Sequence, residues 1–120
     1  MIGLRLAFFI GVLIAILTGC TVCRHTAITD AETYACRGYK TRVATYYLAG
    51  SSHDSHAQAQ VLDKDGQWKW VGMLGGIIDA PDYYMRQEGK GIDYYYWSVP
   101  EYRKLLEDNG KSTPRIVICK

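Results

Sequence analysis

The sequence has no block of basic residues, no internal repeat and no low-complexity segment. Its 14 Lys and Arg residues are dispersed among 12 Asp and Glu residues, which gives a formal net charge of +2 at pH 7. Because domains that bind nucleic acid usually gather their basic side chains in one patch, this pattern indicates no nucleic-acid partner. The 120 residues leave room for one small domain with a thin core.

Long apolar runs are absent except at the N-terminus. Residues 6–17 are apolar, and Arg5 is the only charge in the first nineteen residues. This pattern is typical of a secretory signal peptide, so we predict a signal peptide at residues 1–19 and a single domain at residues 20–120. The alternative is a retained membrane anchor, because the run is near the lower length for spanning a bilayer.

The four residues from Leu17 to Cys20 end this run with a Leu-Thr-Gly-Cys sequence. It resembles the lipobox of bacterial lipoproteins, in which the cysteine sulfur is acylated and becomes the new N-terminus. The resemblance implies that a lipid on Cys20 anchors the chain to a membrane of the bacterial cell envelope. Thr21 is not the Asp that in many Gram-negative lipoproteins signals inner-membrane retention. The resemblance therefore favours the outer membrane, with the domain facing the periplasm.

Cysteine is scarce, and its four positions are Cys20, Cys23, Cys36 and Cys119. If Cys20 is lipidated, three thiols remain and one is left over. In an oxidising compartment we expect Cys36 to pair with Cys119, which would close a long loop and stabilise the fold by about 3–5 kcal/mol. Cys23 would then keep its thiol, as a nucleophile requires.

The spacing of apolar, turn and β-branched residues predicts an α+β fold. Alanine recurs every four positions from Ala27 to Ala35, which predicts a helix over residues 26–37 with a face that can approach a sheet closely. A second helix is expected over residues 100–108, and a long loop over residues 75–91. The expected strands cover residues 41–48, 56–62, 67–74, 92–97 and 115–119, with a two-residue hairpin turn at Lys64 and Asp65. The expected architecture is an N-terminal helix packed on a small antiparallel sheet.

Two residues far apart in the sequence carry the candidate chemistry. Cys23 lies near the expected start of the first helix, where the helix dipole favours a thiolate, and His56 opens a strand. A thiol and an imidazole that the fold brings together can act as nucleophile and base. The plain alternative is a structural cysteine and a surface histidine.

Three short motifs surround these two residues: a Cys-Arg-His-Thr-Ala helix start at residues 23–27, a Gly-Tyr turn at residues 38–39, and a His-Ala pair at residues 56–57 ahead of Trp68. Together they resemble the transglutaminase-like superfamily of papain-fold thiol enzymes. The resemblance implies a papain-like minimal fold with Cys23 as nucleophile and His56 as base. The family also places an Asp a few residues after the tryptophan, where this chain has Gly72. The next carboxylates are Asp79 and, behind it, Asp82, and we take Asp79 as the candidate third residue.

The expected function is acyl transfer through a thioester on Cys23 at the cell envelope, acting on a protein or peptide substrate. Water as acceptor would give peptide or amide hydrolysis, and an amine would give cross-linking. No cofactor and no metal are expected. The alternative is a non-catalytic surface lipoprotein of the same fold that binds an envelope component, which the missing Asp favours. A third interpretation, a dithiol or zinc site of Cys20, Cys23 and His25, excludes lipidation of Cys20.

Two further groups have a plain interpretation and a functional one. Gln58 and Gln60, beside His56, are expected to face water, although they could donate hydrogen bonds to an acyl oxyanion. A dense set of tyrosines is expected to cover the core, although it could line a groove for peptide or glycan; its members are Tyr83, Tyr84, Tyr94, Tyr95, Tyr96 and Tyr102.

Overall fold

The computed structural model describes residues 21–47, 55–82 and 93–120. The expected signal peptide and the lipidation residue Cys20 lie outside the described residues, and so does the second half of the loop expected at residues 75–91. Within the described ranges, no helix is both long and apolar enough to span a bilayer.

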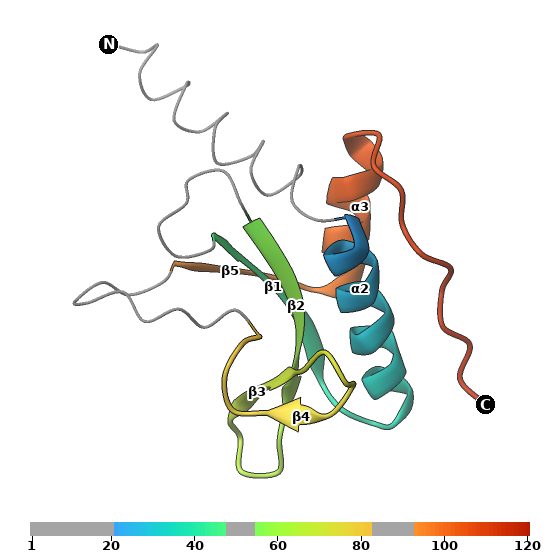
Figure 1. Ribbon diagram of the computed structural model, residues 1–120. Coiled ribbons are helices and arrows are strands. Elements are labelled where there is room, and N and C mark those ends of the chain that lie inside the picture. The colour runs from blue at the N-terminus through green and yellow to red at the C-terminus, as the bar shows by residue number, and fades with distance from the viewer. Residues whose placement is uncertain (1–20, 48–54, 83–92) are drawn as a thin grey trace.

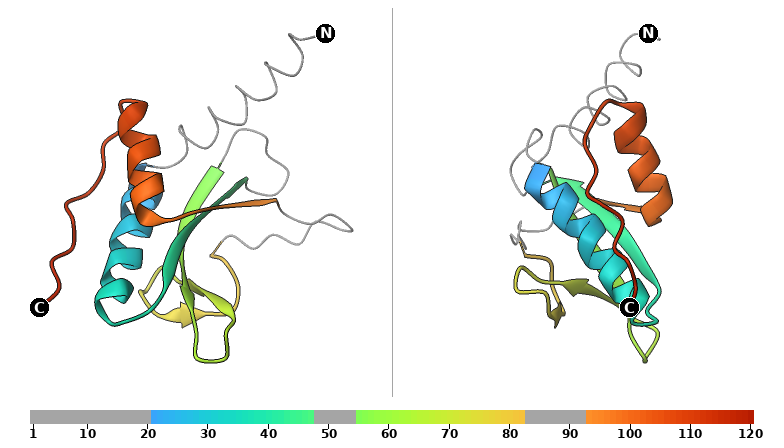
Figure 2. Two further views of the ribbon diagram at one scale, coloured as in Figure 1. Left: turned by 180° about the vertical axis from the view of Figure 1, so that it is seen from behind. Right: turned by 90° about the vertical axis from the view of Figure 1, so that its right-hand side faces the viewer.

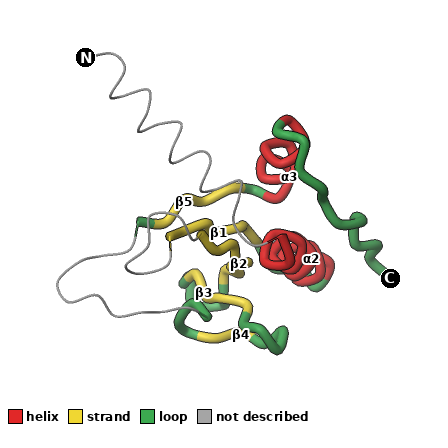
Figure 3. The backbone as a smooth tube through the Cα atoms, turned by 45° about the horizontal axis from the view of Figure 1, so that its top comes forward, coloured by secondary structure: helices red, strands yellow, loops and turns green. Residues whose placement is uncertain are grey.

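The described chain forms two layers, with two helices on one face of a five-stranded antiparallel sheet (Figure 1 and Figure 3). From behind, both helices again lie to one side of the sheet (Figure 2). This arrangement confirms the α+β class, with a helix packed on a small antiparallel sheet. The helices are α2 (Thr21–Cys36) and α3 (Val99–Asp108). The strands, whose order in the sheet is β4-β3-β2-β1-β5, are β1 (Thr41–Tyr47), β2 (Ser55–Leu62), β3 (Trp68–Val71), β4 (Ile77–Ile78) and β5 (Tyr94–Trp97).

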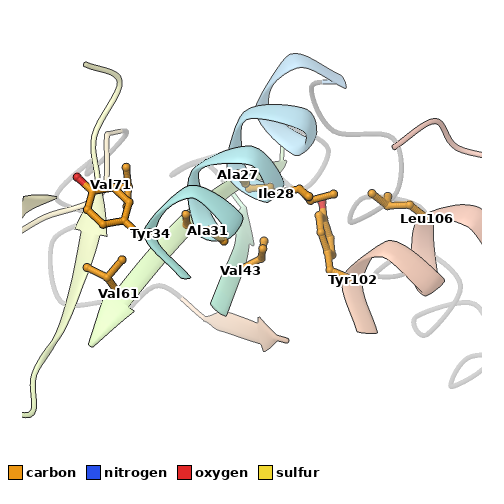
Figure 4. Packing of buried hydrophobic residues seen from close by; sticks show 11 residues of the cluster. Ala27, Ile28, Ala31, Tyr34, Val43, Val61, Val71, Tyr102 and Leu106 are labelled. Carbon is orange, nitrogen blue, oxygen red and sulfur yellow. The ribbon is translucent and has the colours of Figure 1, made fainter. Parts of the chain in front are cut away.

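Small side chains hold α2 against the sheet. Ala27 and Ala31 of α2, labelled in Figure 4, are buried and belong to one core cluster with Ala57 and Ala59 of β2. With only methyl groups between them, the helix and the strand can approach closely and make many short contacts. Ala35, expected to continue the stripe, is exposed instead. A four-residue step advances 40° beyond a full helical turn, so a stripe at this spacing drifts off the buried face.

The helix α2 covers more residues at its start than the alanine pattern predicts. The structure describes it from Thr21, so Cys23 lies in its first described turn. Its end agrees closely with the expected stop, because the N–H of Gly38 donates to the carbonyl of Ala35 at 3.0 Å. Gly38 has a φ of 92°, a conformation that glycine adopts without a Cβ clash.

The hairpin between β2 and β3 differs from the prediction by one residue. The expected turn at Lys64 and Asp65 would place His56 opposite Met73, whereas the observed register pairs Leu62 with Trp68. The observed loop has a third residue, Gly66, with a φ of 78°, which is typical of a turn followed by a bulge. Because a slip of one residue moves every side chain to the other face, the expected register was wrong for the whole strand.

The chain ends without the last expected strand, because residues 111–120 form neither helix nor strand. The expected disulfide between Cys36 and Cys119 is confirmed, with a Cα–Cα distance of 5.2 Å. The N–H of Val117 also donates to the carboxylate of Glu32 on α2 at 3.4 Å. These links keep the segment on the outer side of α2, away from the sheet (Figure 1). A segment held there has no strand edge beside it with which to pair.

Candidate functional site

A pocket of about 280 Å³ opens where the first turns of α2 meet β2. The pairing of β2 with β3 runs only from Gln60 to Leu62, so the pocket lies at the part of the β2 edge beyond the end of this pairing. Its wall combines apolar side chains with a thiol, an imidazole and two carboxyl groups, which belong to Cys23, His56, Asp30 and Asp82. These four residues form the candidate site.

The thiol of Cys23 enters the pocket from the first described turn of α2. Its side chain is half-buried, and it is not one of the two cysteines in the disulfide. The first described turn of α2 contains no acidic residue.

His56 enters the same pocket from the second residue of β2. It is 8% exposed, and its ring makes an edge-to-face contact with Tyr46 at 5.4 Å between centroids. Burial lowers the pKa of His56 below its ordinary value, and the nearby charge of Asp82 acts in the opposite direction. The imidazole is therefore neutral at neutral pH, which is the form that can accept a proton.

The two side chains reach the pocket from different sides of β2. Ala57 and Ala59 face α2, and side chains alternate along a strand, so His56 belongs to the sheet face that carries Tyr46. The pocket bends around the edge of β2, which is how a thiol on α2 and this imidazole come to line one cavity.

The Gln58 side chain connects β2 to the end of β3 and to the segment after it by hydrogen bonds. Its Nε2 donates to the carbonyl of Val71 at 2.8 Å, and its Oε1 accepts from the N–H of Asp82 at 3.1 Å and from the Tyr46 hydroxyl at 3.2 Å. The expectation that Gln58 and Gln60 face water is wrong, since each is 3% exposed. The hydrogen bond from Gln58 therefore holds the backbone of Asp82 beside the pocket.

Of the two aspartates that follow β3, Asp82 lines the pocket and Asp79 does not. Asp79 is 87% exposed and forms an ion pair with Lys69, which lowers the pKa of the Asp79 carboxyl. Gly72, at the position where the resemblance leads one to expect an Asp, lines the pocket. A Cβ at Gly72 would stand 3.0 Å from the Cδ1 of Ile78, so a side chain there would require the Ile78 side chain to shift by a few tenths of an ångström. The chain instead brings a carboxylate to the pocket ten residues later, at Asp82.

Asp30 is the pocket residue that the sequence interpretation missed. Burial, and to a smaller extent the charge of Asp82, raise the pKa of Asp30 to about 6. Two carboxyl groups at one cavity oppose each other's ionisation. The available signal was its position seven residues after Cys23, which is two helical turns and hence the same face of α2.

Of the proposed zinc or dithiol site, the described residues include Cys23 and His25. His25 lies near Ser112 of the C-terminal segment, with its Nε2 3.0 Å from the Ser112 hydroxyl. No group of three or more His, Cys, Asp or Glu residues that could hold a metal ion is present among the described residues. Cys20, the other half of the proposed dithiol, lies outside them.

The tyrosines divide into two groups. Tyr102 is fully buried in the core beneath α2, and Tyr94 packs partly buried against Tyr46 and Trp70, as expected for core tyrosines. Tyr95 and Tyr96 are 38% and 48% exposed, contrary to that expectation. Tyr83 and Tyr84 lie outside the described residues.

The fold and the pocket define a small disulfide-linked α+β protein with a thiol, an imidazole and two carboxyl groups at one cavity. Comparisons with protein-family models, curated proteins and solved structures give no match. Any functional assignment therefore rests on the pocket and on the sequence motifs around it.

Proposed function

We propose that this chain is a small thiol enzyme of the transglutaminase-like superfamily, with a papain-like fold, and that its pocket performs acyl transfer through Cys23. The observation that carries the proposal is the single cavity lined by Cys23, His56 and Asp82. The order of elements gives further support, because a helix bearing the thiol packs on the hairpin strand that bears the imidazole.

In the proposed reaction, neutral His56 takes the proton of the Cys23 thiol, and the sulfur attacks the carbonyl carbon of an amide. The carbon–nitrogen bond breaks, the proton on the imidazole passes to the departing amine, and a thioester remains on Cys23. Water or a second amine then attacks the thioester and restores the thiol. The carboxylate of Asp82 stabilises the imidazolium that forms between these steps, a role supported by its electrostatic influence on His56.

The cellular setting of this proposal comes from the sequence. A lipid on Cys20 would place the reactive Cys23 three residues from a membrane anchor of the bacterial envelope, on the periplasmic side of the outer membrane. The substrate would then be an envelope protein or peptide close to the membrane surface.

The first test measures the rate at which iodoacetamide alkylates Cys23 in the full chain between pH 5 and pH 9. We expect an apparent pKa below about 8.5, the ordinary value for cysteine. His56→Gln should lower the rate near pH 7 by about 10²-fold, the usual contribution of a positioned base. Asp82→Asn should also slow alkylation, whereas the matched variant Asp79→Asn should match the wild type. A Cys23 that stays inert below pH 8, or a profile that His56→Gln leaves unchanged, contradicts the proposal.

The second test asks whether an acyl group transfers. With an activated p-nitrophenyl ester we expect a burst of p-nitrophenol and a mass increase located on Cys23, both lost in Cys23→Ser. Adding an amine should speed the second phase if the enzyme forms cross-links, and should leave it unchanged if only water is accepted. No burst at any pH rules out the thioester mechanism.

A second candidate function is a non-catalytic envelope lipoprotein of the same fold that binds an envelope component. The observation in its favour is that Cys23 and His56 approach the cavity from different sides of β2, with the His56 ring against Tyr46. An inert Cys23 in an otherwise folded chain would support this candidate.

A further inference from the structure

The sheet face opposite the helices carries an arginine between two aromatic rings. The guanidinium carbon of Arg42, on β1, lies 3.9 Å from the centre of the Trp68 ring and 3.7 Å from that of Tyr96. Tyr96 in turn stacks on Tyr94, with 6.3 Å between ring centroids and 19° between planes. The Nε–H of Arg42 donates to the Oε1 of Gln60 at 2.7 Å. Groups from β2, β3 and β5 therefore hold both faces and one edge of this guanidinium.

The remaining edge of the Arg42 guanidinium points to solvent. Among the described residues, Arg42 makes no other hydrogen bond and belongs to none of the ion pairs. Its two terminal nitrogens, Nη1 and Nη2, are also absent from the buried polar atoms that lack a partner, so water reaches them. The edge that arginine uses for bidentate recognition is thus open and held in one orientation.

The charge of Arg42 is not balanced by the described part of the chain. Burial lowers the pKa of Arg42, and the ionisable neighbour that opposes this effect is the phenol of Tyr96, not an Asp or a Glu. The side chain nevertheless stays cationic, because guanidinium ionises far above neutral pH. A guanidinium that is already held in place and partly desolvated binds an anion more strongly than a mobile surface arginine does. Binding then costs less free energy, because less side-chain freedom is lost and less water is displaced.

We propose that the open edge of Arg42 is a binding site for a carboxylate group of a ligand. A planar guanidinium fork and a planar carboxylate match in geometry, with two parallel N–H···O hydrogen bonds. The fork supplies one positive charge, and Lys69 of β3, which lies between Trp68 and Trp70 and so faces the other side of the sheet, is paired with Asp79. A singly charged carboxylate therefore suits the site better than a phosphate dianion. The carboxylate could belong to an acidic amino-acid side chain or to a sugar acid, and the experiment separates the two.

The proposal is independent of the Cys23 pocket, which Arg42 does not line. Failure of one proposal therefore leaves the other standing, and the readouts do not overlap.

The test follows the Arg42 Nε–Hε and Trp68 indole signals of the full ¹⁵N-labelled chain in neutral detergent by NMR. The probes are N-acetylglutamate amide and glucuronate, and their neutral counterparts are N-acetylglutamine amide and glucose. We expect saturable shifts at both signals with at least one acid, with a Kd on the order of 1–10 mM, and none with the neutral counterparts. The acid that binds more tightly identifies the source of the carboxylate.

Two lysine variants show whether the fork is responsible. Arg42→Lys keeps the charge but loses the fork, and we expect about tenfold weaker binding of the acid. The matched control is Arg37→Lys, because Arg37 lies over a single ring, that of Tyr34, at 4.8 Å, and its replacement should leave the Kd unchanged. A thermal melt confirms that each variant is folded.

Three results would overturn the proposal. The first is no saturable shift in the wild type with either acid up to about 50 mM, well above the expected Kd. The second is equal affinity in Arg42→Lys and in the wild type. The third is tighter binding of inorganic phosphate than of both acids, which would refute the assignment to a carboxylate.

Discussion

The hydroxyl of Tyr102 allows a direct test of how polar groups are satisfied in this small core. Tyr102 is fully buried beside Ile28 of α2 and close to Leu106 of α3 (Figure 4). Its hydroxyl oxygen has no hydrogen-bond partner among the described residues. Burial also raises the pKa of Tyr102 far above its ordinary value. We therefore expect that removing this oxygen, and nothing else, stabilises the fold.

The magnitude follows from what burial of the hydroxyl costs. A buried donor or acceptor without a partner costs about 1–3 kcal/mol, whereas the ring that Phe retains keeps its packing. Tyr102→Phe should therefore raise the free energy of unfolding by about 1–2 kcal/mol. For a domain of this size, each kcal/mol corresponds to a rise in Tm of roughly 4–8 °C.

The assay is urea and thermal unfolding of the full chain by circular dichroism, with the disulfide intact. The matched control is Tyr46→Phe, because Tyr46 is 1% exposed but its hydroxyl donates to the Oε1 of Gln58 at 3.2 Å. This variant should lower the free energy of unfolding by about 0.5–1.5 kcal/mol, the net value of a typical hydrogen bond. Both variants remove a hydroxyl oxygen, yet the free energy of unfolding should rise in Tyr102→Phe and fall in Tyr46→Phe. A loss in Tyr102→Phe as large as that in Tyr46→Phe would refute the reasoning.

The raised pKa of Tyr102 also predicts how stability changes at high pH. The unfolded tyrosine loses its proton near pH 10, while the folded one keeps it to higher pH. Wild-type stability should therefore fall as the pH rises above about 10, and this part of the fall should be absent in Tyr102→Phe.

Three further perturbations should change the stability of the fold in a direction that burial or the disulfide determines. Asp30→Asn should stabilise the fold at pH 7.5 by about 1 kcal/mol and have no effect below about pH 4. The reason is that the pKa of Asp30 is raised to about 6 only in the folded state. A difference in Tm that does not depend on pH would contradict this. The pKa of His56 is lowered by burial, so its NMR titration midpoint should lie below 6.5, and stability should fall as the pH drops below that value, where the unfolded imidazole binds its proton first. A midpoint above 6.5 would show that the charge of Asp82 outweighs burial. Reducing the Cys36–Cys119 bond, which joins residues 83 positions apart, should lower the free energy of unfolding by about 3–5 kcal/mol in a Cys23→Ser background. A loss below about 1 kcal/mol would mean that the disulfide constrains the unfolded chain little.

Much of the local structure could be predicted because it depends on neighbouring residues. The β-branched and aromatic run after residue 40 and the alternation after His56 predicted β1 and β2 to within one residue. Pro100 in the first turn and the stop at Asn109 and Gly110 predicted α3, which in the structure begins with a capping box between Ser98 and Glu101. The prediction failed at the hairpin, where two-residue and three-residue turns share the same Asp, Lys and Gly composition. Only the observed pairing of Leu62 with Trp68 distinguishes them.

The candidate site was less accessible to prediction. Cys23 and His56 could be singled out by residue type and motif, but Asp30 and Gln58 carry no chemical signature of their own. Asp82 lines the cavity because Gln58 bonds to its backbone, and Asp79 points away because Lys69 pairs with it. Arg42 likewise reads as an ordinary strand residue until β3 and β5 bring an aromatic ring to each of its faces.

The sequence by itself determined the two helices, the strands β1 and β2, the α+β class and the pairing of Cys36 with Cys119. Helix and strand propensities act between neighbouring residues, and few pairings are open to four cysteines. Only the tertiary structure decided which carboxylate lines the cavity with the thiol and the imidazole, and which arginine keeps an open edge. Those outcomes depend on register and on contacts between distant strands, and a shift of one residue in a hairpin reverses the side on which every following side chain lies.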